Sequence, residues 1–191
     1  MELRPQDVVV VLKLLTTDGS PWSYAKLGED LAMSASHVFA SVDRARTSHL
    51  LDFAAIAPRA RTPRVARQTR DRQAVLPRPN RSNLKEFLIH GVKYAFPVER
   101  GGPTRGIPTA EAARPLDRHF PQHFPLPPVW PYAEGPLRGI AFSPLYKNVP
   151  QAALRDSKLY ELLALVDAIR EGRAREREIA IRELTARIDP Q

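Results

Sequence analysis

The first fifty residues carry apolar positions at helical spacing in three short segments. The first segment begins at Pro5, which suits the first position of a helix because its missing N–H group is not needed there. The second begins after Ser23 and the third after Ser34, and a serine hydroxyl can cap a helix. The inward-facing positions of the three segments are Val8, Val11, Leu12 and Leu15, then Leu27 and Leu31, and finally Val38, Val42 and Ala45. We therefore predict three short helices between residues 4 and 51.

The third predicted helix has a polar and basic face opposite its apolar positions. We expect Ser36, His37, Ser41 and Arg44 on this face, where they can hydrogen-bond to phosphates or base edges. Free backbone N–H groups at the amino end of the helix, where Ser34 lies, favour anions. This helix therefore has the features of a recognition helix that enters the major groove of DNA.

An arginine-rich segment follows this helix. Between Ala57 and Arg81 the chain holds eight arginines and one acidic residue, Asp71, and so carries +7 of its net charge of +8. Four prolines and the absence of aromatic residues argue against a buried helix or a central strand, so we predict an exposed arm or hairpin. Arginine binds phosphate or the edge of guanine through two hydrogen bonds. We expect contact with nucleic acid here, the alternative being a solvated linker that only adds charge.

The segment from Tyr24 to Val38, YAKLGEDLAMSASHV, resembles the helix-turn-helix of bacterial winged-helix transcriptional regulators of the MarR and ArsR type. The shared frame is a tyrosine, an alanine-x-leucine, a second leucine and a closing serine-x-serine-x-valine. The resemblance covers residues 4–56 and implies that Leu50 and Leu51 lead into a β-hairpin wing. Such a wing would place the arginines beside the minor groove or the DNA backbone.

The pattern changes after Pro79. Asn80 or Ser82 can cap a further helix that runs to Gly91, and residues 92–96 then alternate like a strand.

A stretch rich in proline and glycine, residues 99–134, is predicted to be a long irregular crossing held by its aromatic residues. Its glycines and the arginines beside them fit an anion-binding turn. Residues 137–142 alternate again, and we expect them to pair with the strand near Tyr94.

The last forty residues are strongly helical. Asp156 or Ser157 can cap a helix that ends at Gly172, and a final helix follows in which arginine and glutamate alternate. Winged-helix repressors dimerise through terminal helices, and recognition of two DNA half-sites favours a two-fold dimer. We therefore expect a homodimer, the alternative being that both helices complete the core of a monomer.

These elements together predict an α+β protein. Residues 1–79 are predicted to form a winged helix-turn-helix DNA-binding domain with an arginine-rich wing. Residues 80–191 are predicted to form a small mixed α+β and helical region for packing and dimerisation.

Composition narrows the chemistry. The 191 residues contain no cysteine, which excludes disulfides, thiolate zinc sites, iron–sulfur clusters and cysteine nucleophiles. The longest apolar run, Val8 to Leu15, includes Lys13 and is much shorter than the roughly 20 residues that span a bilayer. The amino terminus lacks the pattern of a secretory signal. We expect a cytoplasmic protein with no membrane partner.

The motifs of catalysis and metal binding are missing from the sequence. His119 and His123 are four residues apart, but Pro121 between them prevents the regular helical face of a metal-binding pair. The glycines near residue 101 match neither a phosphate-binding loop nor a dinucleotide fingerprint. We therefore predict no catalytic residues, no cofactor and no metal, and a protein that is not an enzyme.

The function predicted from these patterns is sequence-specific binding of double-stranded DNA, in the role of a transcriptional repressor. The expected DNA contacts are Ser34, Ser36, His37, Ser41 and Arg44 on the helix, and Arg59, Arg61, Arg64, Arg67 and Arg70 in the arginine-rich segment. Two alternatives stay open. One is an antitoxin-like module that binds a protein partner as well as DNA, and the other is an RNA-binding protein whose arginines recognise structured RNA.

Overall fold

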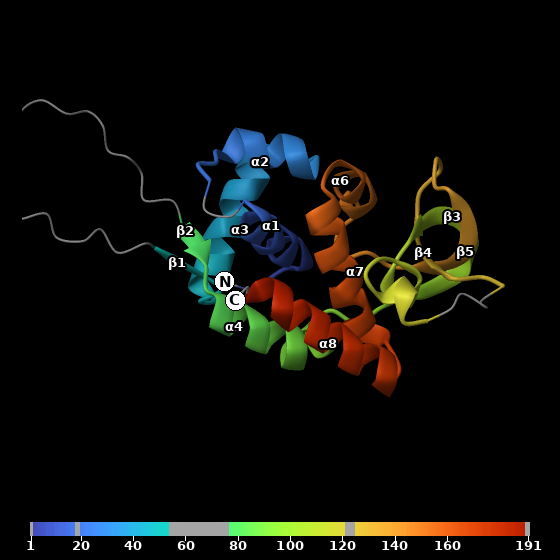
Figure 1. The fold of residues 1–191 in the computed structure, drawn as a ribbon. Helices are drawn as coiled ribbons and strands as arrows, with labels where there is room; N and C mark the ends of the chain where they lie inside the picture. Colours follow the sequence, from blue (N-terminus) through green and yellow to red (C-terminus); the bar gives the residue numbers. More distant parts are fainter. Residues whose placement is uncertain (1, 18–19, 54–76, 121–124, 190–191) are drawn as a thin grey trace, which may run out of the picture.

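Two adjacent helices, α1 (Pro5–Thr16) and α7 (Ser157–Glu171), form the centre of the molecule. The computed structural model describes residues 2–17, 20–53, 77–120 and 125–189. α1 is buried from Asp7 to Leu15 because it packs against both α3 and α7. Figure 1 shows the other helices around this pair and a small barrel beyond α7. The architecture is mixed α+β, as predicted.

The first three helices form where the sequence predicts them. α2 (Tyr24–Leu31) and α3 (Ala35–Thr47) each begin after a serine whose side chain accepts a backbone N–H. Ser23 Oγ accepts from the N–H of Lys26 at 3.1 Å, and Ser34 Oγ accepts from the N–H of His37 at 3.2 Å. Both predicted N-caps are therefore confirmed.

A two-stranded sheet follows α3. β1 (Leu51–Phe53) pairs antiparallel with β2 (Pro77–Pro79), with Leu51 opposite Pro79. The residues that connect these two strands, 54–76, lie outside the described residues. Asn80 then caps the next helix, since its side chain accepts the N–H of Asn83 at 2.9 Å.

The predicted strand at 92–96 is wrong, because these residues continue a helix. α4 (Arg81–Glu86) runs through a π-helical turn at Phe87–Gly91 into α5 (Val92–Ala95). Leu84, Leu88 and Val92 are fully buried at intervals of four residues, which is a helical spacing. Tyr94, which the alternation placed on the same side as Val92, is instead exposed.

The region predicted to be irregular contains two strands of a closed three-stranded barrel. β3 (Arg100–Pro108) pairs antiparallel with both β4 (Pro128–Pro131) and β5 (Leu137–Phe142), and β4 and β5 are parallel. Close packing in this barrel requires glycine at two positions, Gly106 in the stretch predicted to be irregular and Gly139 in the predicted strand. A Cβ on Gly106 would lie 2.1 Å from the carbonyl oxygen of Trp130, and one on Gly139 would lie 2.0 Å from that of Pro127. β5 forms where predicted, but its partners are β3 and β4 rather than a strand near Tyr94.

The last forty residues are helical, as predicted. α6 (Val149–Arg155) precedes α7, and α8 (Ala174–Ile188) follows it. Asp156 caps α7 by accepting the N–H of Leu159 at 3.0 Å, and α7 ends at Gly172. α7 is buried from Leu162 to Arg170, so its apolar stripe belongs to the core of this chain. That core is continuous and includes residues of both predicted domains.

Candidate nucleic-acid interface

The unit formed by α2, a tight turn and α3 positions the candidate DNA-contacting residues. Ala32 ends α2 in the left-handed conformation, with φ of 52°, and Ser34 begins α3 only two residues later. Gly28 allows the chain to return so closely, because a Cβ there would lie 2.6 Å from the carbonyl oxygen of Met33. A short turn of this kind fixes the angle between two helices.

Three of the predicted contact residues on α3 are exposed. Ser34, Ser36 and His37 all lie in its cap or first turn and are open to solvent. At 3.6 residues per turn, Ser36 lies in the middle of the exposed face, with Phe39 on one flank and His37 on the other. The amino-terminal half of α3 therefore presents polar groups outward.

Two of the predicted contact residues are not on the exposed face. Ser41 is fully buried, because it lies three residues after Val38 and four before Ala45 and so shares their inward side. Arg44 is only 11% exposed and forms an ion pair with the fully buried Asp7 on α1. The prediction that both side chains lie on the exposed face of the helix is wrong, since Ser41 is in the core and Arg44 neutralises a buried carboxylate.

The arginine-rich segment is bounded by the β1–β2 pair. Arg59, Arg61, Arg64, Arg67 and Arg70 all lie outside the described residues. Figure 1 shows β1 and β2 beside α3 at one edge of the molecule. Asn83 of α4 donates a hydrogen bond at 2.9 Å to the carbonyl of His49, two residues after α3, and the N–H of Asn80 donates one at 2.9 Å to the carbonyl of Leu50. The residues that flank the β1–β2 pair are therefore tied to the chain just after α3.

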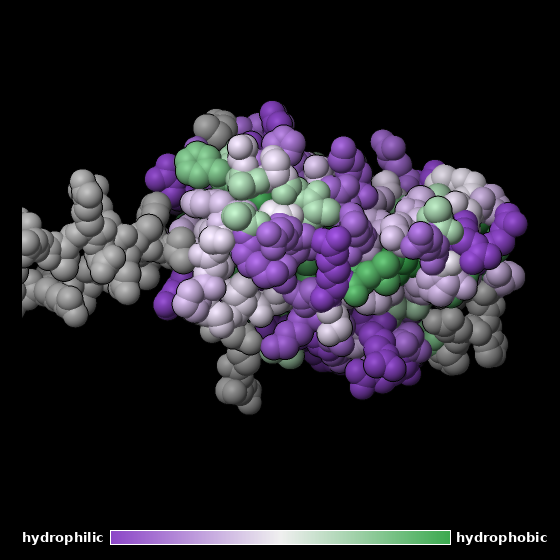
Figure 2. Space-filling view, turned by 90° about the horizontal axis from the view of Figure 1, so that it is seen from above, coloured by the Kyte–Doolittle hydropathy of each residue, from purple (hydrophilic) through white to green (hydrophobic). Residues whose placement is uncertain are grey.

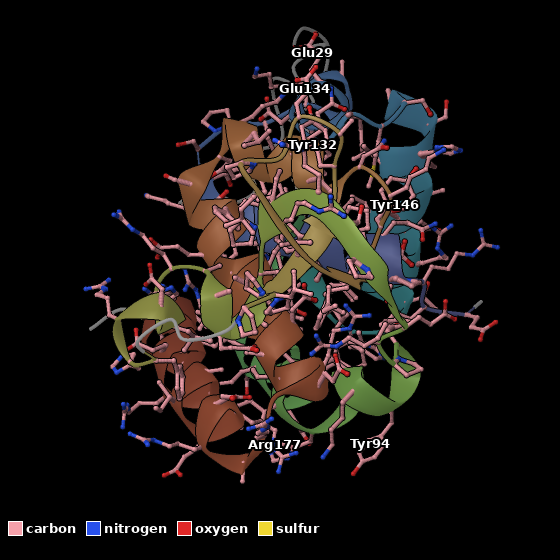
Figure 3. The ribbon with its side chains drawn as sticks, turned by 90° about the vertical axis from the view of Figure 1, so that its right-hand side faces the viewer. Glu29, Tyr94, Tyr132, Glu134, Tyr146 and Arg177 are labelled. Carbon is pink, nitrogen blue, oxygen red and sulfur yellow. The ribbon has the colours of Figure 1, made fainter. Side chains whose placement is uncertain are left out.

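A small cavity of about 90 Å³ adjoins the exposed start of α3. Its lining includes His37, Ala40 and Arg44 from α3, Arg4 and Gln6 from the start of α1, and Met33 and Tyr146. Figure 3 shows Tyr146 on the flank where α3 runs, far from Tyr94 and Arg177. The sequence does not predict this neighbourhood, because Tyr146 lies 99 residues after the end of α3 and no local pattern links them.

Hydrogen bonds and ion pairs, most of them involving the second half of the chain, hold α2 in place. Lys13 on α1 lies 2.8 Å from Asp156 and 3.2 Å from Asp30 of α2. Arg155 donates a hydrogen bond to the carbonyl of Glu29, and Asn148 donates one to that of Ala32. Burial by itself would raise the pKa of Asp156, but hydrogen bonds from Lys13 and from the N–H of Leu159 hold it below its ordinary value. The turn between α2 and α3 is thus fixed by contacts from residues 148–156, far along the chain.

Asp167 on α7 is a buried carboxylate, and buried carboxylates are candidates for a chemical role. It accepts hydrogen bonds from Thr109 at 2.8 Å, from Trp130 at 2.6 Å and from Arg170 at 2.7 Å. Burial raises the pKa of Asp167. Arg170 also donates to the carbonyls of Phe96, Pro97 and Ser143. This network joins α7 to the barrel and to the end of α5, so its role is structural.

Two further kinds of site, a metal site and a membrane-spanning helix, are not found among the described residues. No three histidine, aspartate or glutamate side chains among them lie close enough together to hold a metal ion. Nor does any helix there have the length and apolar character needed to span a membrane. No protein-family model, curated protein or solved structure matches the chain.

Proposed function

We propose that this protein binds double-stranded DNA in a sequence-specific manner and acts as a transcriptional repressor. In this proposal the amino-terminal half of α3 enters the major groove, which is wide enough to admit a helix. Ser34, Ser36 and His37 contact base edges or nearby phosphates. Arg59, Arg61, Arg64, Arg67 and Arg70 grip the phosphate backbone or the minor groove from the segment that follows.

The observation that carries the proposal is the position of two features next to each other. An exposed polar helix start, fixed by a tight turn, lies directly before a strand pair that bounds a segment of high positive charge. Phosphate contacts supply affinity and register, while side chains on a helix supply base recognition. Both requirements are met by residues close together in this chain.

A homodimer is the second part of the proposal, and it restricts which surface is available. The apolar faces of α7 and α8 pack within the chain, with Ala180, Leu184 and Ile188 of α8 buried. A dimer that binds two half-sites would therefore use a surface other than these apolar stripes.

The experiment that tests the proposal is a titration of the protein into labelled DNA from its own upstream region and into a scrambled duplex. Each titration is run at two salt concentrations. We expect preference for the native duplex to persist at the higher salt, because base contacts release no counterions. Equal and steeply salt-dependent binding to both duplexes would reduce the protein to a nonspecific polyanion binder. Tighter binding to duplex RNA of matched length would favour RNA as the ligand, and no binding would favour a protein partner.

A further inference from the structure

Phe39 is the feature of α3 that the proposed contacts leave unexplained. It is 58% exposed, although phenylalanine is usually buried. The residues around it on the helix surface are small or polar, with Ala35 and Ser36 one turn before it and Asp43 one turn after it. A large apolar side chain thus projects from a face that is otherwise hydrophilic.

Two aromatic side chains support Phe39 from the side. The ring of Tyr24, at the start of α2, meets the ring of Phe39 edge to face with centroids 5.4 Å apart. Trp22 meets Tyr24 in the same way at 5.3 Å. Trp22 and Tyr24 themselves pack against the core, whereas Phe39 does not. The ring of Phe39 therefore rests against Tyr24 on one side and is open to solvent on the other.

The surface near these helices is mixed in character. Figure 2 shows several hydrophobic side chains among polar ones on the side of the molecule where α2 lies. Asp43, the acidic residue nearest to Phe39 along the helix face, is paired with Arg46 at 2.7 Å, which offsets its repulsion of phosphate. The sequence that follows α3 carries a charge of +7 between Ala57 and Arg81, so the partner chemistry that fits is a polyanion with an apolar group at its surface.

We propose that Phe39 determines specificity by packing against the 5-methyl group of a thymine in the major groove. This inference rests on the proposed function and adds one residue to it. The thymine methyl is the apolar group that a base pair presents in the major groove, and phenylalanine is one of the side chains that contact it. Ser36 then lies over the adjacent base or phosphate, because it is one turn before Phe39 on the exposed face.

The test begins by selecting duplexes from a random-sequence pool with the full-length protein. Each thymine of the selected duplex is then replaced in turn by deoxyuridine, which lacks only the methyl group. We expect one replacement to weaken binding about fourfold, the equivalent of one methyl removed from a dry contact. The variant Phe39→Ala is expected to bind the thymine duplex as weakly as the deoxyuridine duplex, so that the effect of the methyl disappears. Leu154→Ala, which removes a 62% exposed side chain from α6, serves as the matched control and keeps the fourfold effect.

The outcomes separate this inference from the proposed function. If no duplex is enriched, both fail. If duplexes are enriched but every deoxyuridine replacement is tolerated, or the consensus has no thymine, Phe39 does not read a methyl group and DNA binding stands. If Phe39→Ala keeps the sensitivity to deoxyuridine, the methyl is read by another residue. A change in sedimentation of Phe39→Ala with unchanged DNA binding would assign the aromatic row to contact between two copies of the chain.

Thermal unfolding of Phe39→Ala is expected to match the wild type, because the side chain is mostly exposed.

Discussion

The guanidinium of Arg44 holds the carboxylate of Asp7 in two hydrogen bonds, from Nε to Oδ2 at 2.8 Å and from Nη2 to Oδ1 at 2.6 Å. Asp7 is fully buried and also accepts the backbone N–H of Arg4 at 2.8 Å, so it caps α1 from within. The pair therefore joins the amino end of α1 to the last turns of α3. It fixes the orientation of α3 from the buried side, while Ser36 and His37 face solvent on the other.

Replacing Arg44 by alanine is expected to lower stability rather than sequence preference. The change leaves the buried Asp7 carboxylate without its counter-charge, which costs about 3 kcal/mol in comparable pairs. Urea unfolding measures this cost. The double variant Asp7→Ala with Arg44→Ala is expected to be less destabilised than Arg44→Ala alone, because no unpaired charge remains. If the Arg44→Ala protein is as stable as the wild type but loses its preference for its own DNA, Arg44 contacts DNA after all.

Replacing Gly28 by alanine is expected to destabilise the α2–α3 unit by about 1–3 kcal/mol, as overpacking generally does. The added Cβ would lie 2.6 Å from the carbonyl oxygen of Met33, and backbone cannot move aside as a flexible side chain can. Thermal unfolding checks the loss. Ala25→Gly, at an exposed position of the same helix, is the control for helix propensity and should cost about 1 kcal/mol or less.

Ser36→Ala and His37→Ala are expected to act on recognition and not on stability. Both side chains are exposed, so their removal leaves no buried group unpaired. Loss of a base contact reduces discrimination between specific and scrambled DNA by about 1–3 kcal/mol. Competition binding with the two duplexes measures the ratio. Equal weakening for both duplexes would contradict base recognition by these residues.

Single replacements of Arg59, Arg61, Arg64, Arg67 or Arg70 by glutamine are expected to weaken binding to all sequences alike. Each lost phosphate contact should reduce the slope of log affinity against log salt by about 0.9. The slope is obtained by repeating the titration over a range of salt concentrations. An unchanged slope for all five variants would exclude these arginines from the phosphate contacts.

The cluster around Lys13 predicts a dependence of stability on acid. Burial alone would raise the pKa values of Asp30 and Asp156 above their ordinary value of 3.8. Hydrogen bonds and charge from Lys26 and Lys13 hold the pKa of Asp30 below that value, and those of Lys13 do the same for Asp156. A lowered carboxyl pKa contributes stability that is present above the unfolded value and lost as pH falls through the folded one. We therefore expect stability to decline as pH drops below about 4. Asp156→Asn should weaken this decline in pH-dependent urea unfolding, whereas Glu134→Gln at an exposed position should not.

The sequence by itself determined where most helices begin and end. Pro5, Ser23, Ser34, Asn80 and Asp156 start helices and Gly172 ends one, because each acts through its own backbone or through a partner at most four residues away. It also fixed the apolar positions of α3 and the exposure of Ser36 and His37, which follow from helical periodicity.

Only the tertiary structure decided which groups those elements meet. Arg44 has the charge and the hydrogen-bond donors expected of a DNA contact. In the structure its guanidinium instead pairs with Asp7, 37 residues earlier in the chain. Residues 92–96 alternate like a strand, yet packing against α7 makes them helical. Gly106 lies in a stretch predicted to be irregular, yet it allows two strands of the barrel to approach closely, because a Cβ there would lie 2.1 Å from the carbonyl oxygen of Trp130. In each case the deciding partner is distant in sequence, and a local pattern carries no information about a contact that only folding creates.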